Sequence, residues 1–93
     1  MYDRLLNRMR RLMLERRYIV TAHAYDEMAA DDVAVWDIEG TILTGKIVER
    51  QKDRVTSENK YRLRGKALDG SSMEVVAKFS VTGKLVVVTV YSV

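Results

Sequence analysis

The spacing of apolar residues changes at Gly45, and this change limits the folds open to the chain. Before Gly45, apolar residues recur about every three to four positions, which is typical of one face of an amphipathic helix. After Gly45 they recur about every second position, as in strands that bury one face. Helices and strands that occupy separate parts of a chain indicate an α+β fold rather than an alternating α/β fold.

The first part of the chain is predicted to form three helices. Thr21 offers a hydroxyl cap to the second helix, and Asp31 or Asp32 is expected to cap the third. Gly45 is expected to end the third helix in the left-handed conformation. The predicted helices cover Asp3–Arg17, Ala22–Ala30 and Val33–Thr44, with a short extended segment, Tyr18–Val20, between the first two.

The second part is predicted to form four strands. Polar Gln51–Asn59 is expected to be a mobile connection, and Asp69-Gly70 and Thr82-Gly83 are turn signals. Leu85–Tyr91 is almost entirely apolar or β-branched, as in a central strand covered on both faces. We therefore expect N-terminal helices packed on one face of a four-stranded, mainly antiparallel sheet. The predicted strands are Lys46–Arg50, Lys60–Ala67, Met73–Val81 and Leu85–Tyr91.

Composition limits the chemistry that the chain can perform. Its 93 residues suit a single domain, 1–93, with 1–17 as an N-terminal helix. Cys is absent and His occurs once, which excludes thiolate chemistry and makes a His-based metal site improbable. No apolar run approaches the roughly 18 residues that span a bilayer. These features predict a cytoplasmic protein without membrane contact, metal or other cofactor.

Charge is segregated along the chain although the net charge is only +3. Residues 1–19 and 46–66 are rich in Arg and Lys, whereas residues 20–45 carry acidic side chains and no Lys or Arg. Such asymmetry is able to steer polyanions toward one surface. The alternative is that basic and acidic segments simply pair within the fold.

The order and spacing of several short segments resemble the prokaryotic domain of unknown function 4258 family, over residues 18–91. This resemblance implies a RelE-like toxin topology, with helices on a curved antiparallel sheet, and RNA as a target. The chain has Glu27 and Asp31 where members often carry Arg, and Met73-Glu74-Val75 where many have a second His. The segments that carry the resemblance are His23-Ala24, Met28, Asp31, Ile42–Glu49, Gly65 and Val87–Tyr91.

Three residues are candidates for acid–base catalysis of RNA cleavage. His23 is the only imidazole, a group whose charge changes near neutral pH, and it suits a base or an acid. Glu49 suits a base or a partner that orients His23, and Tyr91 suits a proton donor or a stacking residue. The structural alternatives are a helix-capping histidine, a surface carboxylate paired with a cation, and a tyrosine at the rim of the core.

A row of cations is the candidate nucleic-acid surface. Lys60, Arg62, Arg64 and Lys66 alternate with apolar residues and therefore share one strand face, at about 7 Å spacing. Arg grips phosphate through paired N–H donors. The alternative is a solvated face or a face neutralised by the acidic helices.

Two functions remain open on this basis. The first is an RNA-binding, toxin-like protein with metal-independent ribonuclease activity, whose partners are RNA or the ribosome and an antitoxin protein. The second is a non-catalytic module that binds a protein or a nucleic acid on the same fold.

Overall fold

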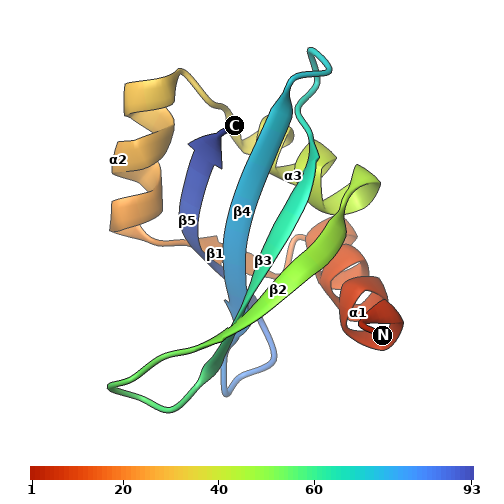
Figure 1. Cartoon of the computed structure of the whole chain (residues 1–93), viewed down its shortest axis with the longest axis vertical. Coiled ribbons are helices and arrows are strands. Elements are labelled where there is room, and N and C mark those ends of the chain that lie inside the picture. The colour runs from red at the N-terminus through yellow and green to blue at the C-terminus, as the bar shows by residue number, and fades with distance from the viewer.

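The computed structural model describes all 93 residues, which form three helices and five strands (Figure 1). The predicted first helix is three residues too long, because the chain turns back at Arg16, whose φ is 58°. The elements are α1 (Asp3–Leu14), β1 (Tyr18–Val20), α2 (Ala22–Asp31), α3 (Val35–Thr44), β2 (Lys46–Lys52), β3 (Asn59–Lys66), β4 (Ser72–Phe79) and β5 (Leu85–Ser92).

The sheet is mixed, with strand order β1-β5-β4-β3-β2. The prediction of four strands is wrong, because Tyr18–Val20 forms a fifth strand that pairs in parallel with Leu85–Val87. This strand has only three residues and its partner lies at the other end of the sequence, so local periodicity does not reveal it. The other three pairings are antiparallel, as expected. The prediction that Leu85–Tyr91 is a central strand holds only for Leu85–Val87, which lie between β1 and β4, since β5 has no strand on its other side beyond Val87.

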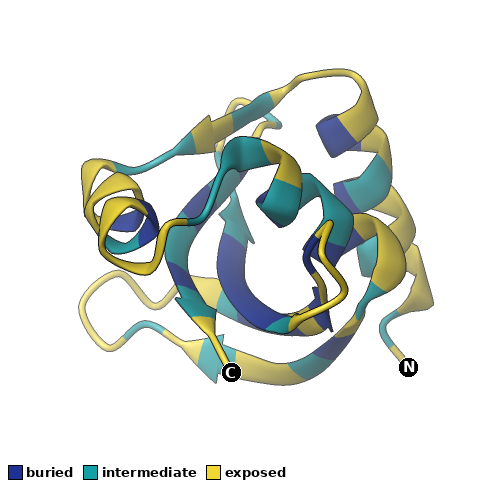
Figure 2. Cartoon of the chain, turned by 90° about the horizontal axis from the view of Figure 1, so that it is seen from above, coloured by how far each residue is buried: buried dark blue, intermediate teal, exposed yellow.

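The core lies between the curved sheet and the helices (Figure 2). Alternate residues of β3, including Tyr61 and Leu63, point into it, which confirms the period of two read for this strand. Ile38 and Ile42 of α3 and Met9 of α1 lie in the same core, each with no side-chain surface exposed to solvent. Helices α1 and α3 therefore cover one face of the sheet (Figure 1). The other face of β2, β3 and β4 has no helix across it, and we call it the open face.

Helix α2 lies along the edge of β5, so the expectation that all helices cover one face is only partly correct (Figure 1). Thr21 caps α2 as predicted, accepting a hydrogen bond from the Ala24 N–H at 3.1 Å. The predicted cap of α3 by Asp31 or Asp32 is wrong. Asp32 adopts the left-handed conformation that ends α2, and the N-cap of α3 is Ala34. The Ala34 N–H donates to the Asp37 carboxylate at 3.0 Å instead.

The end of α3 packs directly against β3 because two glycines leave room for it. A Cβ atom at Gly65 would overlap the Thr41 carbonyl oxygen, and one at Gly45 would overlap the Arg64 carbonyl oxygen. The predicted left-handed conformation of Gly45 is wrong, because its φ of −95° is extended backbone. Arg10 of α1 donates to the Gly45 carbonyl at 2.7 Å and ties the two helices together at this point.

The hairpin between β2 and β3 is longer than expected. Gln51 and Lys52 belong to β2, so the connection predicted for Gln51–Asn59 shrinks to residues 53–58. The turns at Gly70 and Gly83 form as predicted, both with positive φ. None of the three helices has the length and apolar character needed to cross a bilayer.

Candidate functional site

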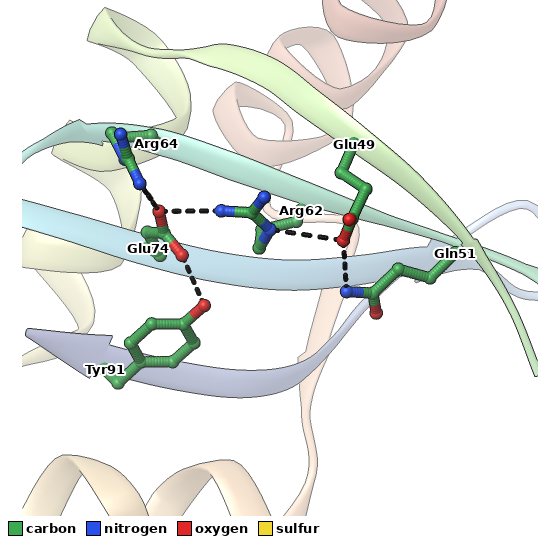
Figure 3. Close-up of polar contacts among 6 residues, drawn as sticks. All are labelled: Glu49, Gln51, Arg62, Arg64, Glu74 and Tyr91. Carbon is green, nitrogen blue, oxygen red and sulfur yellow. Dashed lines mark hydrogen bonds and ion pairs between the residues drawn. The ribbon is translucent and has the colours of Figure 1, made fainter. Parts of the chain in front are cut away.

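Four neighbouring strands each contribute a polar side chain to one row on the open face (Figure 3). Glu49 of β2 lies opposite Arg62 of β3, and Glu74 of β4 lies opposite both Arg64 of β3 and Tyr91 of β5. An irregularity between Ile47 and Glu49 brings Glu49 into register with Arg62. Without that bulge, strand alternation would turn Glu49 away from Arg62.

Glu74 is the centre of the row, and its side chain is only 3% exposed. Its Oε2 atom accepts hydrogen bonds from Arg62 Nη1 at 2.9 Å and from Arg64 Nε at 2.7 Å. Its Oε1 atom accepts a short hydrogen bond from the Tyr91 hydroxyl. Both carboxylate oxygens are therefore occupied, and the buried charge is compensated by two guanidinium groups.

Arg62 links Glu74 to a second carboxylate, Glu49. The Arg62 Nε atom donates to Glu49 Oε1 at 3.3 Å, and Gln51 donates to the same oxygen at 2.6 Å. The Glu49 side chain is 47% exposed, so its second oxygen remains open to solvent and to a ligand. The row thus runs from an accessible carboxylate, through a guanidinium and a buried carboxylate, to a phenol.

The protonation of the row follows from these contacts. Burial favours the neutral form of Glu74, but hydrogen bonds from Tyr91, Arg64 and Arg62 outweigh it and hold the pKa of Glu74 below its ordinary value. Hydrogen bonds from Gln51 and Arg62 lower the pKa of Glu49. The hydrogen bond to Glu74, together with burial, raises the pKa of Tyr91. At neutral pH the two carboxylates are therefore ionised and the phenol is protonated.

The four predicted phosphate-binding cations lie along one face of β3, and each has a partner. Arg62 and Arg64 bind Glu74, as described above. Lys60 Nζ lies 3.8 Å from Asp53 Oδ2, and Lys66 Nζ donates to Ser72 Oγ at 3.0 Å. The ion-pair partners come from the strands and the β2–β3 turn, not from the acidic helices.

His23 has no hydrogen bond or ion pair with this row. It occupies the first turn of α2, its side chain is 70% exposed, and its Nε2 atom lies 3.4 Å from Glu27 Oε1. Of the three predicted catalytic residues, the structure therefore joins Glu49 and Tyr91 through Arg62 and Glu74. It gives His23 a contact only within its own helix.

Glu74 is the residue that the sequence reasoning missed. The available signal is its position as the one carboxylate in the otherwise apolar run Met73–Ala77. A charged residue in a buried strand requires partners, and the alternating arginines of the neighbouring strand β3 supply them. No group of three or more His, Asp or Glu side chains is arranged to hold a metal ion.

Comparison with known families gives one match, to the family described as Domain of unknown function (DUF4258), over residues 20–92. The chain belongs to this family. The match covers α2, α3 and all strands except the first two residues of β1, so the Glu74 row lies within the DUF4258 domain. Among curated proteins and among solved structures, no protein matches the chain.

Proposed function

We propose that this DUF4258 protein cleaves RNA without a metal ion, using the row on the open face. One observation carries the proposal: an ionised, accessible carboxylate and a protonated phenol lie at opposite ends of a row that contains two arginines. Cleavage by the RNA 2′-hydroxyl needs a base, an acid and positive charge around the phosphate. The row contains each of these groups.

Each residue has a defined role in this proposal. Glu49 takes the proton from the 2′-hydroxyl, whose oxygen attacks phosphorus. Arg62 and Arg64 hold the phosphate oxygens and stabilise the negative charge that develops on them. The bond from phosphorus to the 5′ oxygen breaks, and that oxygen takes a proton from Tyr91. The products are a 2′,3′-cyclic phosphate and a 5′-hydroxyl.

Glu74 acts as a positioning residue. Its two oxygens already accept hydrogen bonds from Tyr91, Arg62 and Arg64, so it is not free to accept a substrate proton. It fixes the direction of both guanidinium groups, and the hydrogen bond that it accepts from Tyr91 is the main cause of the raised pKa of Tyr91. The phosphate would share these guanidinium groups with Glu74.

The test is cleavage of a labelled single-stranded RNA by the purified protein, with and without EDTA. We expect cyclic-phosphate products in both conditions. Glu49→Gln and Tyr91→Phe are each expected to slow cleavage by about 10²–10⁴-fold, the usual effect of removing a positioned acid or base. Glu15→Gln, at an exposed carboxylate beyond α1, is the matched control and should cleave at the wild-type rate. Intact RNA with the folded wild-type protein, with and without ribosomes, would refute ribonuclease activity.

The resemblance of the sequence supports a wider setting for this activity. We infer that the chain acts in the cytoplasm as the toxin of a toxin–antitoxin pair with a RelE-like topology, on free or ribosome-bound RNA. Induction in a bacterial host should then arrest growth and degrade RNA, and Tyr91→Phe should relieve both effects. Growth without arrest would count against the toxin role.

A protein-interaction module is the second candidate, and one surface feature favours it. Trp36 of α3 is 60% exposed, and exposed large apolar side chains often mark protein contacts. The neighbouring turns of α3 and α1 line a recess of about 160 Å³ that includes Leu14 and Leu43. A protein that leaves RNA intact, and that loses a protein partner on Trp36→Ala, would support this second function.

A further inference from the structure

Three of the four β3 cations, Lys60, Arg62 and Arg64, form ion pairs, whereas the cations of the β2–β3 hairpin tip do not. Arg50, Lys52 and Arg54 are exposed, and none of them forms an ion pair. The two acidic residues of the same hairpin tip are paired elsewhere, Asp53 with Lys60 and Glu58 with Lys78. The hairpin therefore carries three exposed, unpaired cations beyond the row that the sequence pattern singled out.

These cations stand on a projecting arm (Figure 1). The last paired position between β3 and β4 is Tyr61 with Ala77, but β2 and β3 continue to the pair Lys52 and Asn59. Beyond Tyr61, β3 no longer pairs with β4, so β2 and β3 separate from β4 and β5 as a two-stranded ribbon, which we call the arm, residues 50–60. No other strand pairs with either edge of this ribbon.

The tip of the arm has a fixed conformation. The Asp53 carboxylate accepts hydrogen bonds from the Val55 N–H at 2.8 Å and the Thr56 N–H at 3.0 Å. The backbone N–H of Asp53 donates to the Glu58 carbonyl at 2.8 Å, which closes the turn. These local hydrogen bonds hold Arg54 at the tip. Because the turn is already ordered, less conformational entropy of the turn is lost when a ligand binds.

The arm continues into a second basic surface on the helix side of the sheet. Arg50 lies opposite Tyr61, whose ring packs edge-on against Phe79 at 6.3 Å. The Arg8 guanidinium of α1 covers the Phe79 ring at 4.3 Å. Positive charge thus extends from the arm toward α1, while the proposed catalytic row occupies the open face beside the base of the arm.

We propose that the arm binds the phosphate backbone of single-stranded RNA outside the cleaved linkage, through Arg50, Lys52 and Arg54. This inference rests on the proposed function for the identity of the polyanion. Arg50 and Lys52 point to the same side of β2, about 7 Å apart, and contact phosphates without reading bases. The arm therefore selects long RNA over short RNA, whatever the sequence.

The test compares two 2′-O-methyl oligonucleotides, which lack the attacking hydroxyl, of about six and about twenty nucleotides. The arm variant is Arg50→Gln/Lys52→Gln/Arg54→Gln. The control variant is Arg16→Gln/Arg17→Gln/Lys84→Gln, at exposed cations outside the arm that also form no ion pair. Each loses three charges from a formal net charge of +3, so the two variants have equal net charge.

We expect the wild type to bind the long oligonucleotide more tightly than the short one, and the arm variant to lose this difference. The slope of log affinity against log salt for the long oligonucleotide should fall by about 0.7 for each lost phosphate contact, and by about 2 for three. The control should keep the wild-type slope. Equal losses in both variants, or no gain with length, would overturn the role of the arm.

Failure of the arm and failure of the catalytic row give different results. If the short oligonucleotide binds through Arg62 and the long one binds no more tightly, the proposal for the arm is wrong and the proposal for the row stands. If only the long oligonucleotide binds, and the arm variant loses this binding, the proposal for the arm stands and the proposal for the row is wrong. If neither is bound, both proposals are wrong.

Discussion

Glu27 Oε1 accepts a hydrogen bond from the backbone N–H of Val90 at 3.0 Å, which joins α2 to β5 across 63 residues of sequence. Strand β1 pairs with β5 only as far as Val87, so the rest of that edge has no neighbouring strand. The Ser92 N–H approaches the Asp31 carboxylate at 3.5 Å, one helical turn further along. Two carboxylates of α2 thus replace a missing strand, and the edge is not left as a template for aggregation.

Glu27→Ala should destabilise the protein by about 1–3 kcal/mol, because it leaves the Val90 N–H without an acceptor in a partly buried position. Glu27→Gln retains a side-chain oxygen and should recover most of this loss. Urea unfolding of the two variants measures the difference. If Glu27→Ala and Glu27→Gln unfold at the same urea concentration as the wild type, the bond makes no net contribution to stability.

Glu74 should make stability depend on pH in the acidic range. Its pKa is lowered in the folded protein, so its ionised form stabilises the fold above the ordinary glutamate pKa of about 4.3. This contribution disappears as the pH falls through the lowered pKa and Glu74 becomes protonated. Unfolding free energies measured from pH 7 to pH 3 should fall more steeply in the wild type than in Glu74→Gln. Parallel curves for the two proteins would contradict the lowered pKa.

Gly65→Ala should destabilise the protein by about 1–3 kcal/mol, since the added methyl group meets the Thr41 carbonyl oxygen at the contact between α3 and β3. The same contact fixes the strand that carries Arg62 and Arg64. We therefore expect a weaker affinity for the short oligonucleotide in addition to the lower melting temperature. Wild-type stability would mean that α3 moves away from β3 at little cost.

His23→Ala should leave both stability and cleavage nearly intact. The imidazole is mostly exposed and touches only Glu27, so we expect a change within about 0.5 kcal/mol. The cleavage rate should change much less than in Tyr91→Phe, measured on the same RNA. Loss of cleavage with an unchanged melting temperature would transfer the acid role from Tyr91 to His23. Unfolding would instead show that His23 has a structural role.

The sequence predicts those parts of the fold that depend on local periodicity. The alternation of Tyr61, Leu63 and Gly65 identifies β3 and the face that it buries, and Thr21 identifies the start of α2. It does not predict the pairing of β1 with β5, which depends on residues far apart in the chain. It also does not predict bulges, because one inserted residue changes which side chains share a face.

The candidate site shows the same division between local and distant information. The cations of β3 are visible in the sequence, but their partners are not, because Glu74 reaches them only through strand pairing. Glu49 and Tyr91 are plausible catalytic residues in the sequence, and the register of four strands joins them. His23 is equally plausible as a chemical group, and its i,i+4 spacing on α2 predicts the contact with Glu27, but no local pattern shows that it lies apart from the Glu74 row.

The pairing of Tyr18 with Leu85 affects the order in which the molecule assembles. The antiparallel strands β2 to β5 are joined by short turns and close small loops, whereas β1 needs a partner 67 residues away. During synthesis on the ribosome, β1 and the helices that flank it remain without a strand partner until β5 emerges. Docking of β1 is therefore expected to be the last step in the completion of the native sheet.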